Sequence, residues 1–83
     1  MQKITSRDNQ KLKFARKVRE GLERELIFVD GLRLAEEVLR SEIEIKEVFF
    51  TAQFAETSRG KAFLNKIAAN NLSEVSDNLF DSL

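Results

Sequence analysis

The sequence has no cysteine, histidine, proline, tryptophan or tyrosine, and only three glycines among its 83 residues. Without cysteine there can be no disulfide and no thiol nucleophile, and without histidine there is no imidazole base and no Cys/His zinc site. Most catalytic chemistry is excluded at once. The absence of proline, with 42% hydrophobic and 34% charged residues, favours an ordered globular domain over a disordered chain.

Long apolar runs are also missing. No stretch approaches the length of about 20 residues that crosses a bilayer as a helix. The first residues, Met1-Gln2-Lys3-Ile4, lack the charged-then-apolar pattern of a signal peptide. We therefore expect a cytoplasmic protein with no membrane partner. A chain of this length has room for one small domain, which we expect to span residues 1–83.

The formal net charge of zero hides an uneven distribution of charge. Residues 1–24 contain eight basic and three acidic side chains, a net charge of +5, so residues 25–83 carry −5. A basic segment on an acidic body can bind a polyanion even when the charge of the whole chain gives no such signal.

The basic segment has the pattern of an amphipathic helix. Thr5 and Ser6 both suit an N-cap, and Thr5-x-x-Asp8 is a capping box, so we expect the helix to begin near Arg7 and to end at Gly21. The expected packing side consists of Leu12, Phe14, Ala15, Val18 and Leu22. Lys13, Arg16 and Lys17 are expected on the opposite, cationic side, with no aromatic residue clearly placed for base stacking.

The rest of the chain alternates between strand and helix patterns. Residues 26–29 form an apolar run typical of a central strand, followed by an Asp30-Gly31 turn in which Asp30 can cap a helix. The other expected elements are helices over 32–40, from Thr57 or Ser58 to a left-handed exit at Asn70-Asn71, and over 77–83 with Ser76 as cap, and strands over 43–51 and 72–76. This order predicts a three-layer α/β/α sandwich with a small, mostly parallel sheet.

Three segments together resemble a known family. They are Ile4-Thr5-Ser6-x-x-Asn9-x-x-Leu12-Lys13, Phe28-Val29-Asp30-Gly31-x-Arg33-Leu34 and Glu74-Val75-Ser76-Asp77-x-Leu79-Phe80. In this order they resemble the N-terminal substrate-binding domain of the SpoU-type (TrmH-like) RNA 2′-O-ribose methyltransferases. The resemblance implies the fold of the kink-turn-binding ribosomal proteins and a role in holding RNA. Members of the family often carry glutamate where this chain has Asp30.

The resemblance also implies what lies outside this chain. The parent enzyme would transfer a methyl group from S-adenosylmethionine to a ribose 2′-hydroxyl, in ribosomal RNA rather than transfer RNA. In the family a knotted C-terminal domain binds the cofactor and forms the homodimer, and its motifs do not occur here. We therefore expect no catalytic, cofactor-binding or metal-binding residue in this chain, which is a piece of such an enzyme or a free-standing copy. The alternatives are an RNA-binding module of ribosomal-protein type and a small domain that docks on an acidic protein.

The candidate RNA-binding residues are Arg7, Asn9, Lys11, Lys13, Arg16, Lys17, Gly31 and Arg33. Lysine and arginine side chains on one helix face can neutralise phosphates, although such a face is often only solvated. Asn9 and Lys13 match the family motif, while an asparagine at this place can also bond to the helix start.

Gly31 and Arg33 form a second candidate region at the expected turn from strand to helix. A glycine there lets the backbone approach a phosphate, or it only relieves a tight turn. Arg33 lies in the first helical turn, where a cation opposes the helix dipole. It can contact RNA or pair with Glu36 or Glu37.

Overall fold

The computed structural model describes residues 1–83. It has three strands, β1 (Gln2–Ile4), β2 (Val48–Phe50) and β3 (Leu72–Val75). Its helices are α1 (Gln10–Arg19), α2 (Leu32–Arg40), α3 (Ala52–Glu56), α4 (Ser58–Leu64) and α5 (Asp77–Asp81), with a short 3₁₀ helix, η1 (Ala69–Asn71).

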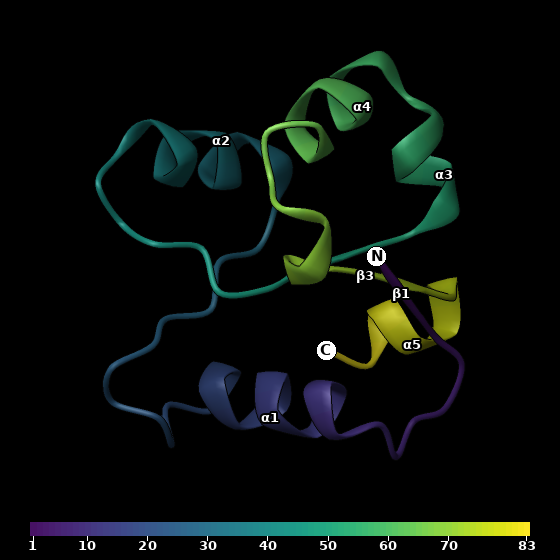
Figure 1. The fold of residues 1–83 in the computed structure, drawn as a ribbon. Helices are drawn as coiled ribbons and strands as arrows, with labels where there is room; N and C mark the ends of the chain where they lie inside the picture. The colour runs from purple at the N-terminus through teal and green to yellow at the C-terminus, as the bar shows by residue number, and fades with distance from the viewer.

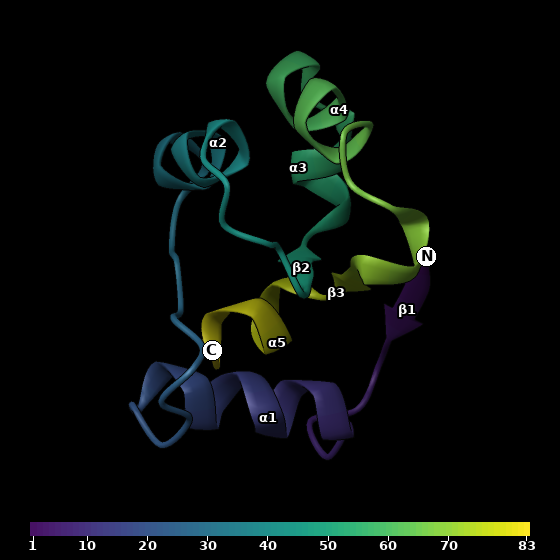
Figure 2. The same ribbon diagram turned by 60° about the vertical axis from the view of Figure 1, so that its left-hand side comes forward.

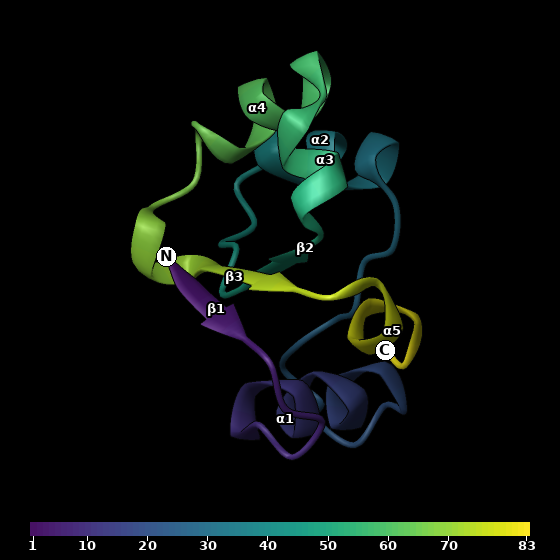
Figure 3. The same cartoon turned by 90° about the vertical axis from the view of Figure 1, so that its right-hand side faces the viewer.

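The three strands form a parallel sheet in the order β1-β3-β2, with β3 in the centre. Ile4 lies opposite Val75 on one side of β3, and Phe50 lies opposite Glu74 on the other. α1 and α5 lie against one face of this sheet, and α2, α3 and α4 lie on the opposite side (Figures 1, 2 and 3). The expected α/β fold class with a small parallel sheet between helices is confirmed.

The main hydrophobic core lies between the sheet and the layer formed by α1 and α5. Ile4 of β1, Leu12 of α1, Val75 of β3 and Leu79 of α5 are all buried and pack together, and the half-buried Phe49 lies against them. Leu12 is completely inaccessible to solvent. Truncation of any one of the four side chains therefore removes contacts to the other three.

Local capping signals account for most of the helix starts. The side-chain oxygens of Thr51, Thr57 and Ser76 accept backbone N–H groups at the starts of α3, α4 and α5. Such caps satisfy N–H groups that have no partner within the helix. The caps expected at Thr57 and Ser76 are confirmed.

The expected central strand over residues 26–29 is wrong. This segment has no regular secondary structure, Ile27 is 69% exposed, and the ring of Phe28 lies under the guanidinium of Arg19, 5.7 Å from its carbon to the ring centre. The chain here runs from α1 in one layer to α2 in the other (Figure 2). β3 takes the central place instead, and β1, with Ile4 as its single buried side chain, was too short and polar to be expected.

Several boundaries also differ from the expectation. α1 begins at Gln10, because its N-cap is Asn9 and not the expected Thr5 or Ser6. The Ser6 hydroxyl accepts the N–H of Asp8 in a turn that precedes the helix. The strand expected over 43–51 is limited to β2, and a short α3 follows it directly. Gly31, with φ of 101°, is the N-cap of α2, so Asp30 does not cap it. No asparagine has a positive φ, and residues 69–71 form η1 instead of a left-handed exit.

No helix combines the length and the apolar character that crossing a membrane requires.

The burial of Leu12 predicts a large loss of stability on truncation. Leu12→Ala leaves a cavity among Ile4, Val75 and Leu79, so it should lower the free energy of unfolding by about 2 to 5 kcal/mol. Leu22→Ala is the matched control, because Leu22 is 65% exposed and its truncation should change stability by less than about 0.5 kcal/mol. Urea unfolding followed by circular dichroism measures both, and equal effects would contradict this core.

Replacing Gly60 by alanine should lower the stability of the domain, whereas helix propensity alone predicts that it would raise it. A Cβ at this buried position of α4 would collide with the carbonyl oxygen of Phe54 and approach the Thr57 hydroxyl. Gly60→Ala should therefore destabilise the domain by about 1 to 3 kcal/mol, although alanine is the better helix former. Lys61→Ala, one residue further and exposed, is the control. A higher melting temperature for Gly60→Ala would show that the corner between α3 and α4 is wrong.

Candidate nucleic-acid interface

The rotation of α1 about its axis decides which of its side chains reach solvent. Leu12 and Ala15 are buried against the sheet and Val18 is half-buried. Phe14 follows Leu12 by two residues, about 200° round a helix of 3.6 residues per turn, and is 46% exposed. The expectation that Phe14 and Leu22 lie on the packing side is therefore wrong.

Arg16 does not belong to the exposed cationic side either. It follows Leu12 by four residues, about 40° round the helix, and so lies beside the packing side. Its Nη2 donates to the Ser82 hydroxyl at 2.9 Å, its Nε to the Ser82 carbonyl at 3.4 Å and its Nη1 to the Arg7 carbonyl at 3.3 Å. The guanidinium joins α1 to the end of α5, and its acceptors are all neutral.

Lys11 forms an ion pair within the fold. Its Nζ lies 3.3 Å from Oε1 of Glu47, whose Oε2 accepts a 2.5 Å hydrogen bond from the hydroxyl of the buried Ser73. Glu47 thus connects α1 to the central strand β3. Because a carboxylate neutralises the ammonium, Lys11 contributes little to an anion-binding surface.

Asn9 is the N-cap of α1. Its Oδ1 accepts the N–H of Lys11 at 2.8 Å, which confirms the structural alternative stated for this residue. Arg7 lies in the turn before the helix with an exposed side chain. Only the carbonyl of Arg7 is used within the fold, so its charge faces solvent at the start of α1.

Lys13 and Lys17 are the two basic candidates on α1 itself that the fold leaves free. Both are exposed, they lie one turn apart on α1, and neither takes part in any of the four ion pairs. α1 itself contains no acidic residue. Together with the exposed Gln10 and Phe14 they form the outer face of α1, which is defined here as Gln10, Lys13, Phe14 and Lys17.

Gly31 and Arg33 lie away from this face, because α2 belongs to the opposite layer (Figures 1 and 2). No strand precedes Gly31, so the expected ligand position at a strand end does not exist there. Arg33 is exposed and forms no ion pair, since Glu36 pairs instead with Arg59 at 2.6 Å. The structure therefore separates the eight candidates into two regions.

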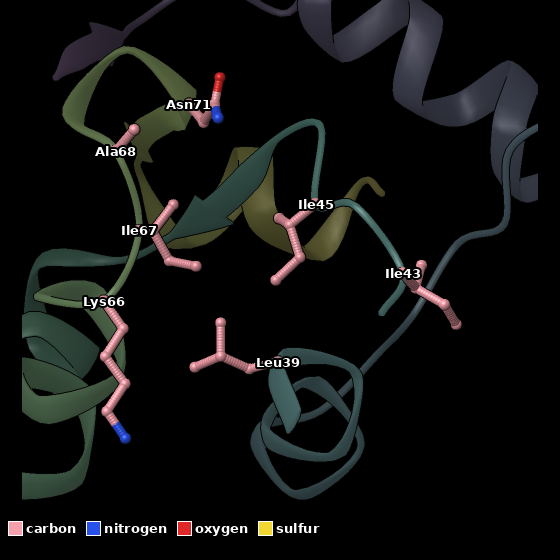
Figure 4. Close-up of a pocket in the computed structure, with 7 residues that line it drawn as sticks. All are labelled: Leu39, Ile43, Ile45, Lys66, Ile67, Ala68 and Asn71. Carbon is pink, nitrogen blue, oxygen red and sulfur yellow. The ribbon is translucent and has the colours of Figure 1, made fainter. Parts of the chain in front are cut away.

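Two of the shallow hollows on the surface show what lies near the candidate residues. One of about 230 Å³ is mostly apolar, and Leu39, Ile45 and Ile67 point toward one another across it (Figure 4). It contains none of the candidate residues. The other, of about 330 Å³, lies at the end of α1 and is lined by Arg16, Arg19, Glu20, Ser82 and Leu83.

Neither the search for a metal site nor the comparison with known proteins gives a further guide to the function. No group of three or more acidic side chains is placed to hold a metal ion. Comparisons with known protein families, with curated proteins and with solved structures return no match. The chemistry of the outer face of α1 is therefore the basis for a functional assignment: two free ammonium groups beside an exposed aromatic ring.

Arg16→Ala should lower stability because it removes the three hydrogen bonds between the guanidinium and the carbonyls and hydroxyl it holds. We expect the free energy of unfolding to fall by about 1 to 2 kcal/mol. Lys17→Ala, on the same helix but free of partners, should change it by less than about 0.5 kcal/mol. Parallel urea titrations test the pair, and an Arg16→Ala variant as stable as Lys17→Ala would show that Arg16 is only a surface charge.

Proposed function

We propose that this domain binds RNA through the outer face of α1, as the substrate-binding domain of a SpoU-type RNA 2′-O-ribose methyltransferase. The observation that carries the binding role is that Lys13 and Lys17 remain exposed and unpaired on a helix without acidic residues. The three sequence segments that resemble the family support the assignment to this enzyme class.

The charge distribution supports a polyanionic ligand. The chain as a whole is neutral, yet residues 1–24 carry a net charge of +5, and the two free lysines project from this segment. A surface of this kind attracts phosphates by releasing the counterions that surround them, and the resulting affinity falls as salt rises. An RNA partner fits better than a neutral protein surface.

The proposed role assigns the chemistry to another part of the enzyme. The family would place the S-adenosylmethionine site and the homodimer contact in its own C-terminal catalytic domain, while this domain holds the RNA. Ribosomal RNA is the preferred substrate, over transfer RNA. Such an enzyme would work in the cytoplasm, where it would act in rRNA processing.

The proposal predicts how salt dependence changes on mutation. Lys13→Ala and Lys17→Ala should each weaken binding to a single-stranded RNA and reduce the slope of log K against log salt by about 0.7, the value for one phosphate contact. Fluorescence anisotropy of an end-labelled RNA over a series of salt concentrations measures both quantities.

Lys61→Ala is the matched control for this titration. Lys61 is an exposed lysine on α4, in the layer opposite α1 (Figure 1), so its removal should leave the slope unchanged. Arg33→Ala reports on the second candidate region. If the lysine variants bind like the wild type while Arg33→Ala or Lys61→Ala binds weakly, RNA contacts the other layer and the proposed surface is wrong.

A further inference from the structure

We propose that the ring of Phe14 stacks on an unpaired nucleobase, so that the domain recognises single-stranded or looped RNA in preference to duplex. This inference rests on the proposed function and specifies its ligand. Phe14 is the most exposed of the seven phenylalanines, with 46% of its surface accessible to solvent, whereas Phe50 and Phe63 are 3% and 4% exposed.

The exposure of Phe14 follows from the packing of α1, and the helix cannot bury this ring without losing its contacts with the core. Leu12 and Ala15 occupy the side that faces the sheet, and Phe14 projects from the far side of the helix. A rotation of α1 that buried Phe14 would expose Leu12, which is the most deeply buried apolar side chain of the core. The ring is therefore held in solvent.

The neighbours of Phe14 favour a nucleic-acid ligand. Gln10 lies one turn before it and Lys17 one turn after it on the same face, and Lys13 precedes it. Side chains three or four residues apart on a helix are adjacent. An aromatic ring beside cations is an arrangement by which proteins bind single strands, because the ring stacks on a base while the cations contact the nearby phosphates.

The same arrangement disfavours a duplex. In an A-form helix the bases are stacked on one another, so their faces are covered and proteins contact phosphates and 2′-hydroxyls instead. Phe14 would then gain no partner. A base splayed from a loop or a single strand offers its face, and stacking tolerates any of the four bases.

The composition of the chain makes stacking directly observable. There is no tryptophan or tyrosine, so Phe14→Trp introduces a single indole whose fluorescence reports contact with a base. The probes are an eight-nucleotide RNA of mixed sequence, the same RNA annealed to its complement, and inorganic polyphosphate, which has charge but no bases. For these measurements a short Gly-Ser extension is added after Leu83, so that the added carboxylate at the new end lies away from the hollow at the end of α1.

The single strand should quench the indole at position 14 in step with binding, and polyphosphate should bind without quenching. Phe80→Trp is the control, because Phe80 is 38% exposed but lies on α5. The fluorescence of the tryptophan at position 80 should not change when RNA is added. In the chain without an introduced tryptophan, Phe14→Leu should bind the single strand about 5- to 150-fold more weakly than the wild type. Phe14→Tyr should bind the single strand like the wild type. The wild type, Phe14→Leu and Phe14→Tyr should all bind polyphosphate equally well.

Two results separate the failure of this inference from that of the proposed function. If the wild type binds RNA with the expected salt dependence but Phe14→Leu binds equally well, or if single strand and duplex bind alike, stacking is wrong and the electrostatic surface stands. If the wild type binds neither RNA nor polyphosphate, both proposals are overturned. Circular dichroism melts of each variant confirm that it is folded.

Discussion

The burial of Leu12 between α1 and the sheet is the contact on which the exposed surface depends. Because Leu12 packs against Ile4, Val75 and Leu79, it sets the rotation of α1 and brings β1, β3 and α5 together around one side chain. The opposite side of a helix held in this way must face solvent. The outer face of α1 is thus a consequence of the core, and its lysines and its phenylalanine are presented by the same packing that stabilises the domain.

Arg19 lies over the ring of Phe28, and the other four basic residues of α1 divide into two groups by their contacts. Lys11 bonds to Glu47, which also accepts the Ser73 hydroxyl, and Arg16 bonds to Ser82 and to the carbonyl of Arg7. These two side chains position the helix. Lys13 and Lys17 have no partner and remain available to a ligand. A polyanion can therefore bind without competing for the ion pair that connects α1 to the sheet.

Local signals in the sequence were sufficient for some elements and not for others. The helix over 32–40 and the caps at Thr57 and Ser76 were predictable, because each depends on residues within one turn. Residues 26–29 were not, because an apolar, β-branched run shows only that a segment can pair, while the parallel neighbours of β3 decide which segments do. In α1 the sequence identified the basic segment, but the places of Phe14 and Arg16 depend on their angles from Leu12. Two of the three hydrogen bonds of Arg16 go to Ser82, 66 positions away in the sequence.

We propose that the side of α1 opposite Leu12 is the surface that contacts RNA. Backbone amide shifts of the ¹⁵N-labelled full chain, titrated with a single-stranded RNA at low salt, map that surface directly. We predict that the largest shifts occur at Gln10, Lys13, Phe14 and Lys17, with little change along α2, α3 and α4. Shifts concentrated around Arg33 or around the hollow at Leu39 and Ile67 would contradict it.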